Sequence, residues 1–332
     1  MLTEKQKTRI ALMDVLRVMA ILLVLNSHLD PLYPIPALAT GGAAGNGIFF
    51  ILSGYCLKLH PTFLRHMGRR ALRLYPGAFI VFGVQLLLGM KTLSGPADVL
   101  HGFIWPTAFW FVGAIILFDA LLFWLERADF TRRFGLFTLV MAALYFAAYL
   151  LIVDKTVWSV EEAGLTTPQQ CFKLIYCFYI YALGYTLRKR GIPAWAKGRT
   201  GLIFAAAAGL FVFSFGFKLI LNRFPATMPL QFLTQLAIIG FTGGAILCAD
   251  GLEGWWTRVS APRLRRAMAA FAGVSLEMYL VQFPVITLCK ALPFPVSVLV
   301  TVAATVVLAF LLHRVDDLIF RRSTALIFQK KG

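Results

Sequence analysis

The chain has 332 residues, of which 59% are apolar and 14% charged, and its mean hydropathy of +0.77 excludes an ordinary soluble domain. Its formal net charge is +17, but the basic residues separate apolar runs and do not gather on one soluble face, which excludes a nucleic-acid-binding protein. The composition therefore predicts an all-α, polytopic membrane protein.

Apolar runs of spanning length predict about ten transmembrane helices joined by short links. We expect them to form one membrane domain over residues 1–332, with no additional soluble domain. The second run is short for a span, so a partly re-entrant segment stays open there. The predicted helices cover residues 11–29, 46–58, 71–90, 99–125, 134–153, 171–187, 201–220, 229–249, 268–289 and 295–313.

The basic residues predict the orientation of these helices. Both tails and every second link between them hold 25 of the 32 Lys and Arg residues. Loops rich in Lys and Arg stay on the cytoplasmic side of a membrane. Both termini are therefore expected in the cytoplasm.

Two ionisable residues, Arg17 and His28, interrupt the first apolar run. A charged group at the centre of a membrane helix costs about 3 kcal/mol on insertion scales, so its default interpretation is functional. The helical rise separates the two side chains by roughly 16 Å along the axis, and they fall on nearly the same face. The alternative for His28 is a polar packing contact between helices.

The next two segments add hydroxyl groups and a pair of arginines. Ser53 and Tyr55 end the run FFILSGY and can offer hydroxyls to a cavity, although Ser53 can instead bond to its own helix. Arg70 and Arg73 are three residues apart, so both project from one side of the start of the third helix. Ordinary cytoplasmic-side charge with snorkelling side chains is the alternative for the arginines.

Together these patterns resemble the acyltransferase 3 family of integral-membrane O-acyltransferases. Three patterns within residues 14–76 carry the resemblance. The first is Arg and His separated by ten residues, the second is Gly-x-x-x-FF-x-LSGY, and the third is Arg-x-x-Arg-x-x-Pro. Three later segments agree with the family. Residues 109–111 resemble its tryptophan helix, residues 178–185 its F-x-x-G-Y helix, and residues 273–284 its penultimate helix. The resemblance covers nearly the whole chain.

The resemblance implies ten helices and transfer of an acyl group, most commonly acetyl, from cytoplasmic acyl-coenzyme A to a hydroxyl group. Acyl transfer needs a base near the hydroxyl and a grip on the donor. We expect His28 to be the base and the forked guanidinium groups to bind the phosphates of the coenzyme. The expected donor-binding residues are Arg17, Arg70, Arg73, Ser53 and Tyr55, and no metal is expected.

A carboxylate in a later helix is a candidate partner for His28. Glu277 is the preferred residue, in either a catalytic or a structural role, and Asp119 is the alternative; either carboxylate could instead pair with Arg17. Many family members have Glu in the neighbourhood of Ile115 and Ile116 and His near the position of Gln282, so no catalytic role is assigned to these positions.

Expected partners are membrane lipids and a carbohydrate acceptor, such as O-antigen or exopolysaccharide, at the plasma membrane of a bacterium. No nucleic-acid partner is expected, and the sequence does not indicate an oligomeric state. The five cysteines are scattered singly, which is typical of small buried apolar side chains. A secondary transporter is the main alternative function, because intramembrane charges also line transport paths; a non-catalytic scaffold would leave the buried charges unexplained.

Overall fold

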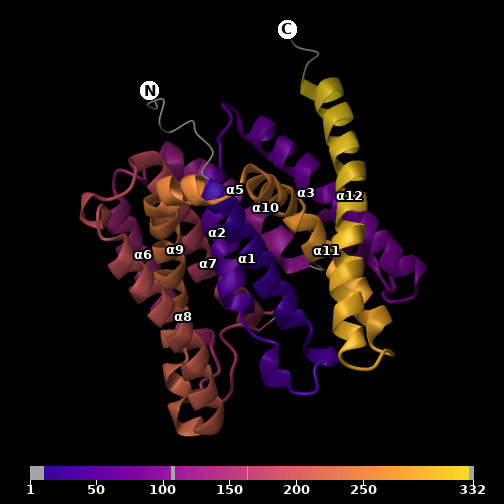
Figure 1. Cartoon of the computed structure of the whole chain (residues 1–332), viewed down its shortest axis with the longest axis horizontal. Helices are drawn as coiled ribbons and strands as arrows, with labels where there is room; N and C mark the ends of the chain where they lie inside the picture. The colour runs from indigo at the N-terminus through magenta and orange to yellow at the C-terminus, as the bar shows by residue number, and fades with distance from the viewer. Residues whose placement is uncertain (1–10, 106–108, 163, 329–332) are drawn as a thin grey trace.

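The computed structural model describes residues 11–105, 109–162 and 164–328 (Figure 1). Within these ranges the chain is helical and contains no β-strand, as the composition predicts. The basic tail residues Lys5, Lys7, Arg9, Lys330 and Lys331 lie outside the described ranges. The helices are α1 (Ala11–His28), α2 (Gly42–Cys56), α3 (Phe63–Leu87), α4 (Pro96–Val99), α5 (Trp110–Arg127), α6 (Phe134–Ile152), α7 (Pro168–Arg190), α8 (Thr200–Arg223), α9 (Phe232–Val259), α10 (Pro262–Gly273), α11 (Ser275–Cys289) and α12 (Val296–Phe328). Short helical turns are η2 (Asp30–Leu32), η3 (Pro36–Leu38), η4 (Leu100–Ile104), η6 (Ala194–Ala196) and η7 (Pro225–Leu230).

Six described segments are long and apolar enough to cross a membrane, and the bent pair α10–α11 adds a seventh if it forms one span. The multi-pass character of the chain is therefore confirmed. Each of the ten predicted ranges overlaps a helix, but α3, α5 and α7 carry several charged residues and do not qualify by composition. The number of ten spans stays a prediction. The six segments are α1, Pro36–Cys56, α6, α8, α9 and Val296–Ala325.

Two corrections concern the third and fourth predicted helices. α3 begins at Phe63, eight residues before the predicted start, and the Thr62 hydroxyl accepts the backbone amide of Arg65 at its first turn. Arg70 and Arg73 therefore lie well inside α3 and not at its start. The range 99–125 is not one helix, because α4 and the turn η4 precede α5, which begins at Trp110.

Two further corrections concern the last predicted helices. Residues 268–289 form two helices, α10 and α11, whose axes differ by 59°. The tenth helix was expected to end at residue 313, but α12 continues to Phe328. Its extra turns carry Asp317, which lies 3.7 Å from Arg73 of α3, and Asp316, which packs beside Gly77 of the same helix. Apolar periodicity alone marks neither the bend nor this extension.

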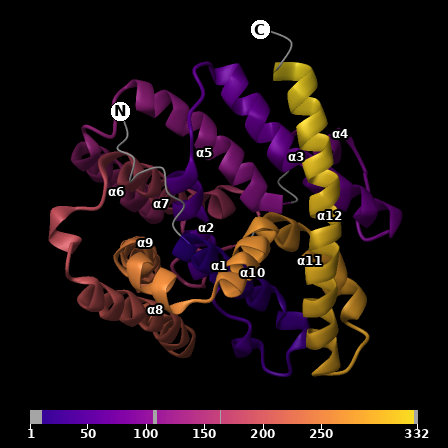
Figure 2. The same cartoon turned by 45° about the horizontal axis from the view of Figure 1, so that its top comes forward.

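α2 runs through the middle of the bundle and packs against α1, α7 and α9 (Figure 2). Glycines allow these backbones to approach closely. A methyl group on Gly45 would lie 2.6 Å from the Ala20 carbonyl oxygen of α1. On the opposite side of α2, a methyl group on Gly54 would overlap the Tyr181 carbonyl of α7. The position of α2 is thus fixed from two sides.

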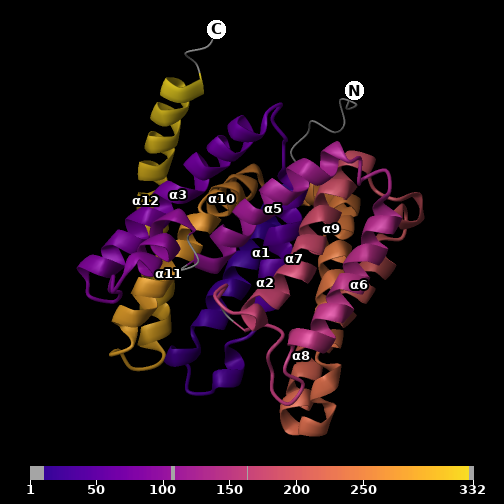
Figure 3. The same ribbon diagram turned by 180° about the vertical axis from the view of Figure 1, so that it is seen from behind.

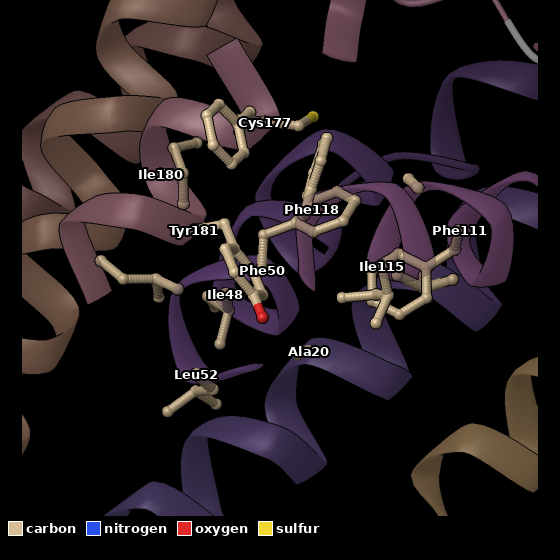
Figure 4. Packing of buried hydrophobic residues seen from close by; sticks show 14 of the residues in the cluster. Ala20, Ile48, Phe50, Leu52, Phe111, Ile115, Phe118, Cys177, Ile180 and Tyr181 are labelled. Atoms are coloured by element: carbon tan, nitrogen blue, oxygen red, sulfur yellow. The ribbon is translucent and has the colours of Figure 1, made fainter. Parts of the chain in front are cut away.

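The aromatic core joins α2 to α5 and α7. Phe50 of α2 packs against Phe118 of α5 with ring centroids 5.2 Å apart, and Phe118 packs against Tyr181 of α7 at 5.7 Å (Figure 4). All three rings are fully buried. This core holds the three helices together where the functional residues lie.

The remaining helices form two groups on either side of α1 and α2. α12 packs against α3 and α11 on one side, and α8 packs against α9 on the other, next to α6 and α7. The first turn of α1 and the last turns of α12 lie at the same end of the molecule (Figures 1 and 3). α1 and α2 therefore lie between the two groups.

Candidate active site

A pocket of about 280 Å³ is lined by three arginines, Arg17 of α1 and Arg70 and Arg73 of α3. Ser53 of α2 also lines it, so four of the five predicted donor-binding residues share one cavity. We call this cavity the arginine pocket. Because α3 begins earlier than predicted, its two arginines can reach the cavity from within the helix.

Arg70 is held in place by a buried carboxylate. Its Nε donates to Asp119 of α5, and the same carboxylate accepts the hydroxyl hydrogen of Tyr181 of α7. Asp119 and Tyr181 are fully buried, whereas 27% of the Arg70 side chain is exposed. Asp119 therefore orients Arg70, and it contacts neither His28 nor Arg17.

The other two arginines are held more loosely. Arg73 lies 3.7 Å from Asp317 of α12, and both side chains are about one-third exposed. Arg17 donates from Nη2 to the Cys56 sulfur over 3.2 Å. These weak partners leave the guanidinium forks available for an anionic ligand.

Tyr55, the fifth predicted donor residue, is not among the residues that line the arginine pocket. It is buried, and the Arg188 guanidinium lies 5.4 Å from its ring centroid. Tyr55 follows Ser53 by two residues, and residues at this spacing face different sides of a helix.

A second pocket, of about 490 Å³, contains His28 at the C-terminal end of α1. His28 Nδ1 lies 2.7 Å from the Val24 carbonyl oxygen. Because a carbonyl oxygen can only accept, Nδ1 carries the hydrogen and Nε2 of the neutral ring keeps its lone pair. The backbone of α1 itself therefore fixes the tautomer that a general base needs. We call this cavity the histidine pocket.

One wall of the histidine pocket comes from the link between α6 and α7, of which residues 153–162 and 164–167 are described. Trp158 and Glu161 of this segment line the cavity together with Lys218 of α8. Lys218 Nζ lies 3.8 Å from Glu161 and 4.8 Å from the Trp158 ring centroid. Burial raises the pKa of the Glu161 carboxyl, and the charge of Lys218 opposes that shift.

Buried polar side chains hold this wall in position. Gln231, just before α9, donates to the Asp154 carbonyl at 2.8 Å and accepts the amide hydrogens of Ser159 and Val160. Lys173 of α7 donates to the carbonyl oxygen of Gly164 at 2.9 Å. These bonds make the segment a fixed wall of the cavity.

The two pockets meet between α2 and the start of α5. Asn46 is the one residue that lines both cavities in the described part of the chain. An aromatic contact path also joins them, because Tyr279 packs against Phe283 at 5.6 Å and Phe283 contacts the His28 ring edge-on at 4.9 Å. Asn46 and these packed rings therefore lie between the two cavities.

Glu277, the predicted carboxylate partner of His28, makes a different contact. Its Oε1 lies 2.6 Å from Nδ1 of His313 in α12. Glu277 is buried, and its Oε2 has no hydrogen-bond partner among the described residues. A catalytic role for Glu277 stays a prediction, and any effect on His28 would have to pass through other residues.

Several lining residues were not singled out from the sequence. Trp158, Glu161 and Lys218 belong to a link and to the end of a helix, where polar residues are ordinary. Asn46 lies within a glycine-rich stretch whose only clear signal is close backbone packing. The one usable signal was Glu161, a carboxylate in a link predicted to be extracytoplasmic.

The chain was compared with known proteins. A family model described as an acyltransferase domain, that of the acyltransferase 3 family, matches residues 10–314. Searches of curated proteins and of solved structures find no match. The matched range includes both pockets and all the helices that form them. The chain therefore belongs to the acyltransferase 3 family and is a multi-pass membrane protein with an acyltransferase domain.

Proposed function

We propose that the protein transfers an acyl group, acetyl in the simplest case, from cytoplasmic acyl-coenzyme A to a hydroxyl of a cell-surface or extracellular carbohydrate. The observation that carries this proposal is the pairing of a cavity lined by three arginines with an adjoining cavity that holds His28. The membership of the acyltransferase 3 family supports the same reaction class.

The arginine pocket suits the donor. Coenzyme A carries phosphate groups, and arginine binds phosphate through two parallel hydrogen bonds. Arg17 and Arg73 have only weak partners, so a phosphate would gain contacts without displacing a strong ion pair. The thin pantetheine arm would then extend past Phe49 and Phe111 toward the junction with the histidine pocket.

The histidine pocket suits the acceptor. His28 Nε2 can take the hydrogen of an acceptor hydroxyl, because Nδ1 already carries a hydrogen and donates it to the Val24 carbonyl oxygen. The surrounding Trp158 and Glu161 offer an amphipathic ring and an acceptor for hydroxyl hydrogens, which matches the mixed surface of a sugar.

The proposed membrane arrangement has ten spans, both termini in the cytoplasm and the protein in the inner membrane of a bacterium. Arg73 contacts Asp317 in the last turns of α12, at the end of the molecule where α1 begins (Figure 1). If that end is cytoplasmic, the arginine pocket lies toward the side that supplies acyl-coenzyme A.

The direct test uses the purified protein in detergent with acetyl-coenzyme A labelled in the acetyl group. A total polysaccharide extract from the native host serves as acceptor. We expect release of the coenzyme A thiol and transfer of label to the polysaccharide as an alkali-labile ester. Absence of both thiol release and label transfer would contradict the proposal. In proteoliposomes, transport of a polar substrate without any acylated product would favour the transporter instead.

A further inference from the structure

The junction between the two pockets carries one polar side chain, that of Asn46. Three and seven residues further along α2, Phe49 and Ser53 line the arginine pocket, as expected for one helix face. Four residues before Asn46, Gly42 lines the histidine pocket. The Asn46 side chain thus stands on the stripe of α2 that passes from one cavity to the other.

Close packing of α1 and α2 keeps Asn46 near the base. A methyl group on Gly42 would lie 2.6 Å from the Ser27 hydroxyl oxygen, beside His28 in sequence. A methyl group on Gly45 would lie 2.8 Å from a methyl carbon of Val24, whose carbonyl holds the His28 ring. The backbone that carries Asn46 therefore touches the turn that orients His28.

The Asn46 amide has no internal task in the structure. Within the described residues, no hydrogen bond joins its side chain to another group. Its neighbours at the junction include the apolar rings of Phe49 and Phe111, whose centroids are 5.7 Å apart. The Asn46 side chain is half-buried, so it is accessible to a ligand that enters the junction, and a hydrogen bond made inside a protein is stronger than in water.

We propose that the Asn46 side-chain amide donates a hydrogen bond to the thioester carbonyl oxygen at the point where donor and acceptor meet. This inference rests on the proposed function. In a low-dielectric site, a fixed donor stabilises the negative charge that develops on this oxygen more than it stabilises the neutral carbonyl. Asn46 is on this account a catalytic residue of the transfer step.

His28 Nε2 removes the hydrogen of the acceptor hydroxyl. At the same time, the oxygen of that hydroxyl attacks the thioester carbon and forms the new C–O bond. The carbonyl oxygen becomes an oxyanion, which accepts the hydrogen bond from Asn46. The C–S bond then breaks, and the departing thiolate takes the proton from His28. The products are the acyl ester and free coenzyme A, and no further reactant is needed.

The test compares Asn46→Ala and Asn46→Asp with the parent protein. Thiol release from acetyl-coenzyme A is measured with the total polysaccharide extract as acceptor, and binding is measured with S-ethyl-coenzyme A, a thioether that lacks the carbonyl oxygen. We expect kcat to fall by about 10²–10³-fold in both variants, the usual effect of losing one oxyanion donor. Affinity for the thioether should stay within about twofold, because no contact to it is removed.

Thr242→Val is the matched control. Thr242 packs against Gly47, next to Asn46, but it lines neither pocket and its hydroxyl bonds only to its own helix. Its kcat should match that of the parent. Asn46→Asp keeps the side-chain volume, so it supplies the result if the alanine variant does not accumulate.

Three outcomes would overturn the inference in different ways. If the parent releases thiol and both Asn46 variants keep its kcat within about threefold, Asn46 is not the donor although the proposed function stands. A loss confined to thioether binding would assign Asn46 to coenzyme binding and would also overturn the inference. If the parent itself neither binds the thioether nor releases thiol, the proposed function fails and this inference fails with it.

Discussion

Gly54 of α2 and Gly184 of α7 face each other where the two helices cross, with no side chain between the backbones. A methyl group on Gly54 would overlap the Tyr181 carbonyl, and one on Gly184 would overlap the Ile51 carbonyl. The two glycines come from the two motifs LSGY and ALGY, which are far apart in the chain. Their mutual packing explains why each motif has glycine in front of its tyrosine.

This contact predicts a stability effect. Gly54→Ala or Gly184→Ala should lower the free energy of unfolding by about 1–3 kcal/mol, because the added methyl group has no space and forces the helices apart. Gly209→Ala is the matched control, since Gly209 lies inside α8 with open space around it. That change should be neutral or stabilising by up to about 1 kcal/mol. Thermal unfolding of the detergent-purified proteins measures the difference, and equal melting temperatures for all three would refute the crossing.

The arginines of α3 should differ in what their removal does to stability. Arg70→Ala leaves the fully buried Asp119 with Tyr181 as its remaining partner, and should destabilise the protein by about 3 kcal/mol, the lower end for a broken buried pair. Adding Asp119→Asn should recover most of that loss. Arg73→Ala breaks only a pair whose side chains are about one-third exposed, and should cost less than about 1 kcal/mol.

Both arginine changes should weaken donor binding. Loss of one charge-assisted contact to phosphate predicts a roughly tenfold higher Kd for acetyl-coenzyme A, and lysine should restore it only in part. The measurement is equilibrium binding of acetyl-coenzyme A to the purified variants. The double variant with Arg70→Ala and Asp119→Asn is included as a control, so that misfolding is not mistaken for the loss of a contact to phosphate. Parent-like affinity in both alanine variants would leave these arginines as orientation signals only.

The orientation predicts which side chains a membrane-impermeant thiol reagent can reach. In a protein without other cysteines, Val157→Cys should react in intact cells and Lys197→Cys only after the membrane is opened. Both positions are exposed. Val157 lies in the link that precedes α7, and Lys197 lies in the link that follows it. A reporter fused after Gly332 should report the cytoplasm. Labelling of residue 197 in intact cells would reverse the proposed topology.

Each of the ten predicted ranges overlaps a helix, because apolar runs of spanning length leave few alternatives. The sequence also selected Arg17, Ser53, Arg70 and Arg73, which line one cavity, because charged and hydroxyl groups are rare in such runs. Two helix breaks were missed, one within the range 99–125 and one at Val274, because each range is long enough and apolar enough overall to resemble a single span.

Partnerships between distant helices could not be predicted from one sequence. Asp119 and Glu277 were both candidates to accompany His28, but the fold pairs them with Arg70 and His313. His28 is instead oriented by a carbonyl of its own helix, a contact that every helical residue offers and no pattern marks. The role of Asn46 depends on where two cavities meet, which only the packing of α2 determines.

The measurement that tests the account most directly compares His28→Gln and His28→Ala with the parent protein. Thiol release from acetyl-coenzyme A, acetyl-coenzyme A binding and membrane abundance are measured side by side. Glutamine can make hydrogen bonds but cannot take up a proton at neutral pH, so both variants should lose about 10²–10⁴-fold in kcat. Abundance and donor affinity should be close to those of the parent, because the arginine pocket is intact. A stable His28→Gln protein that releases thiol at the parental rate would contradict the assignment of His28 as the base.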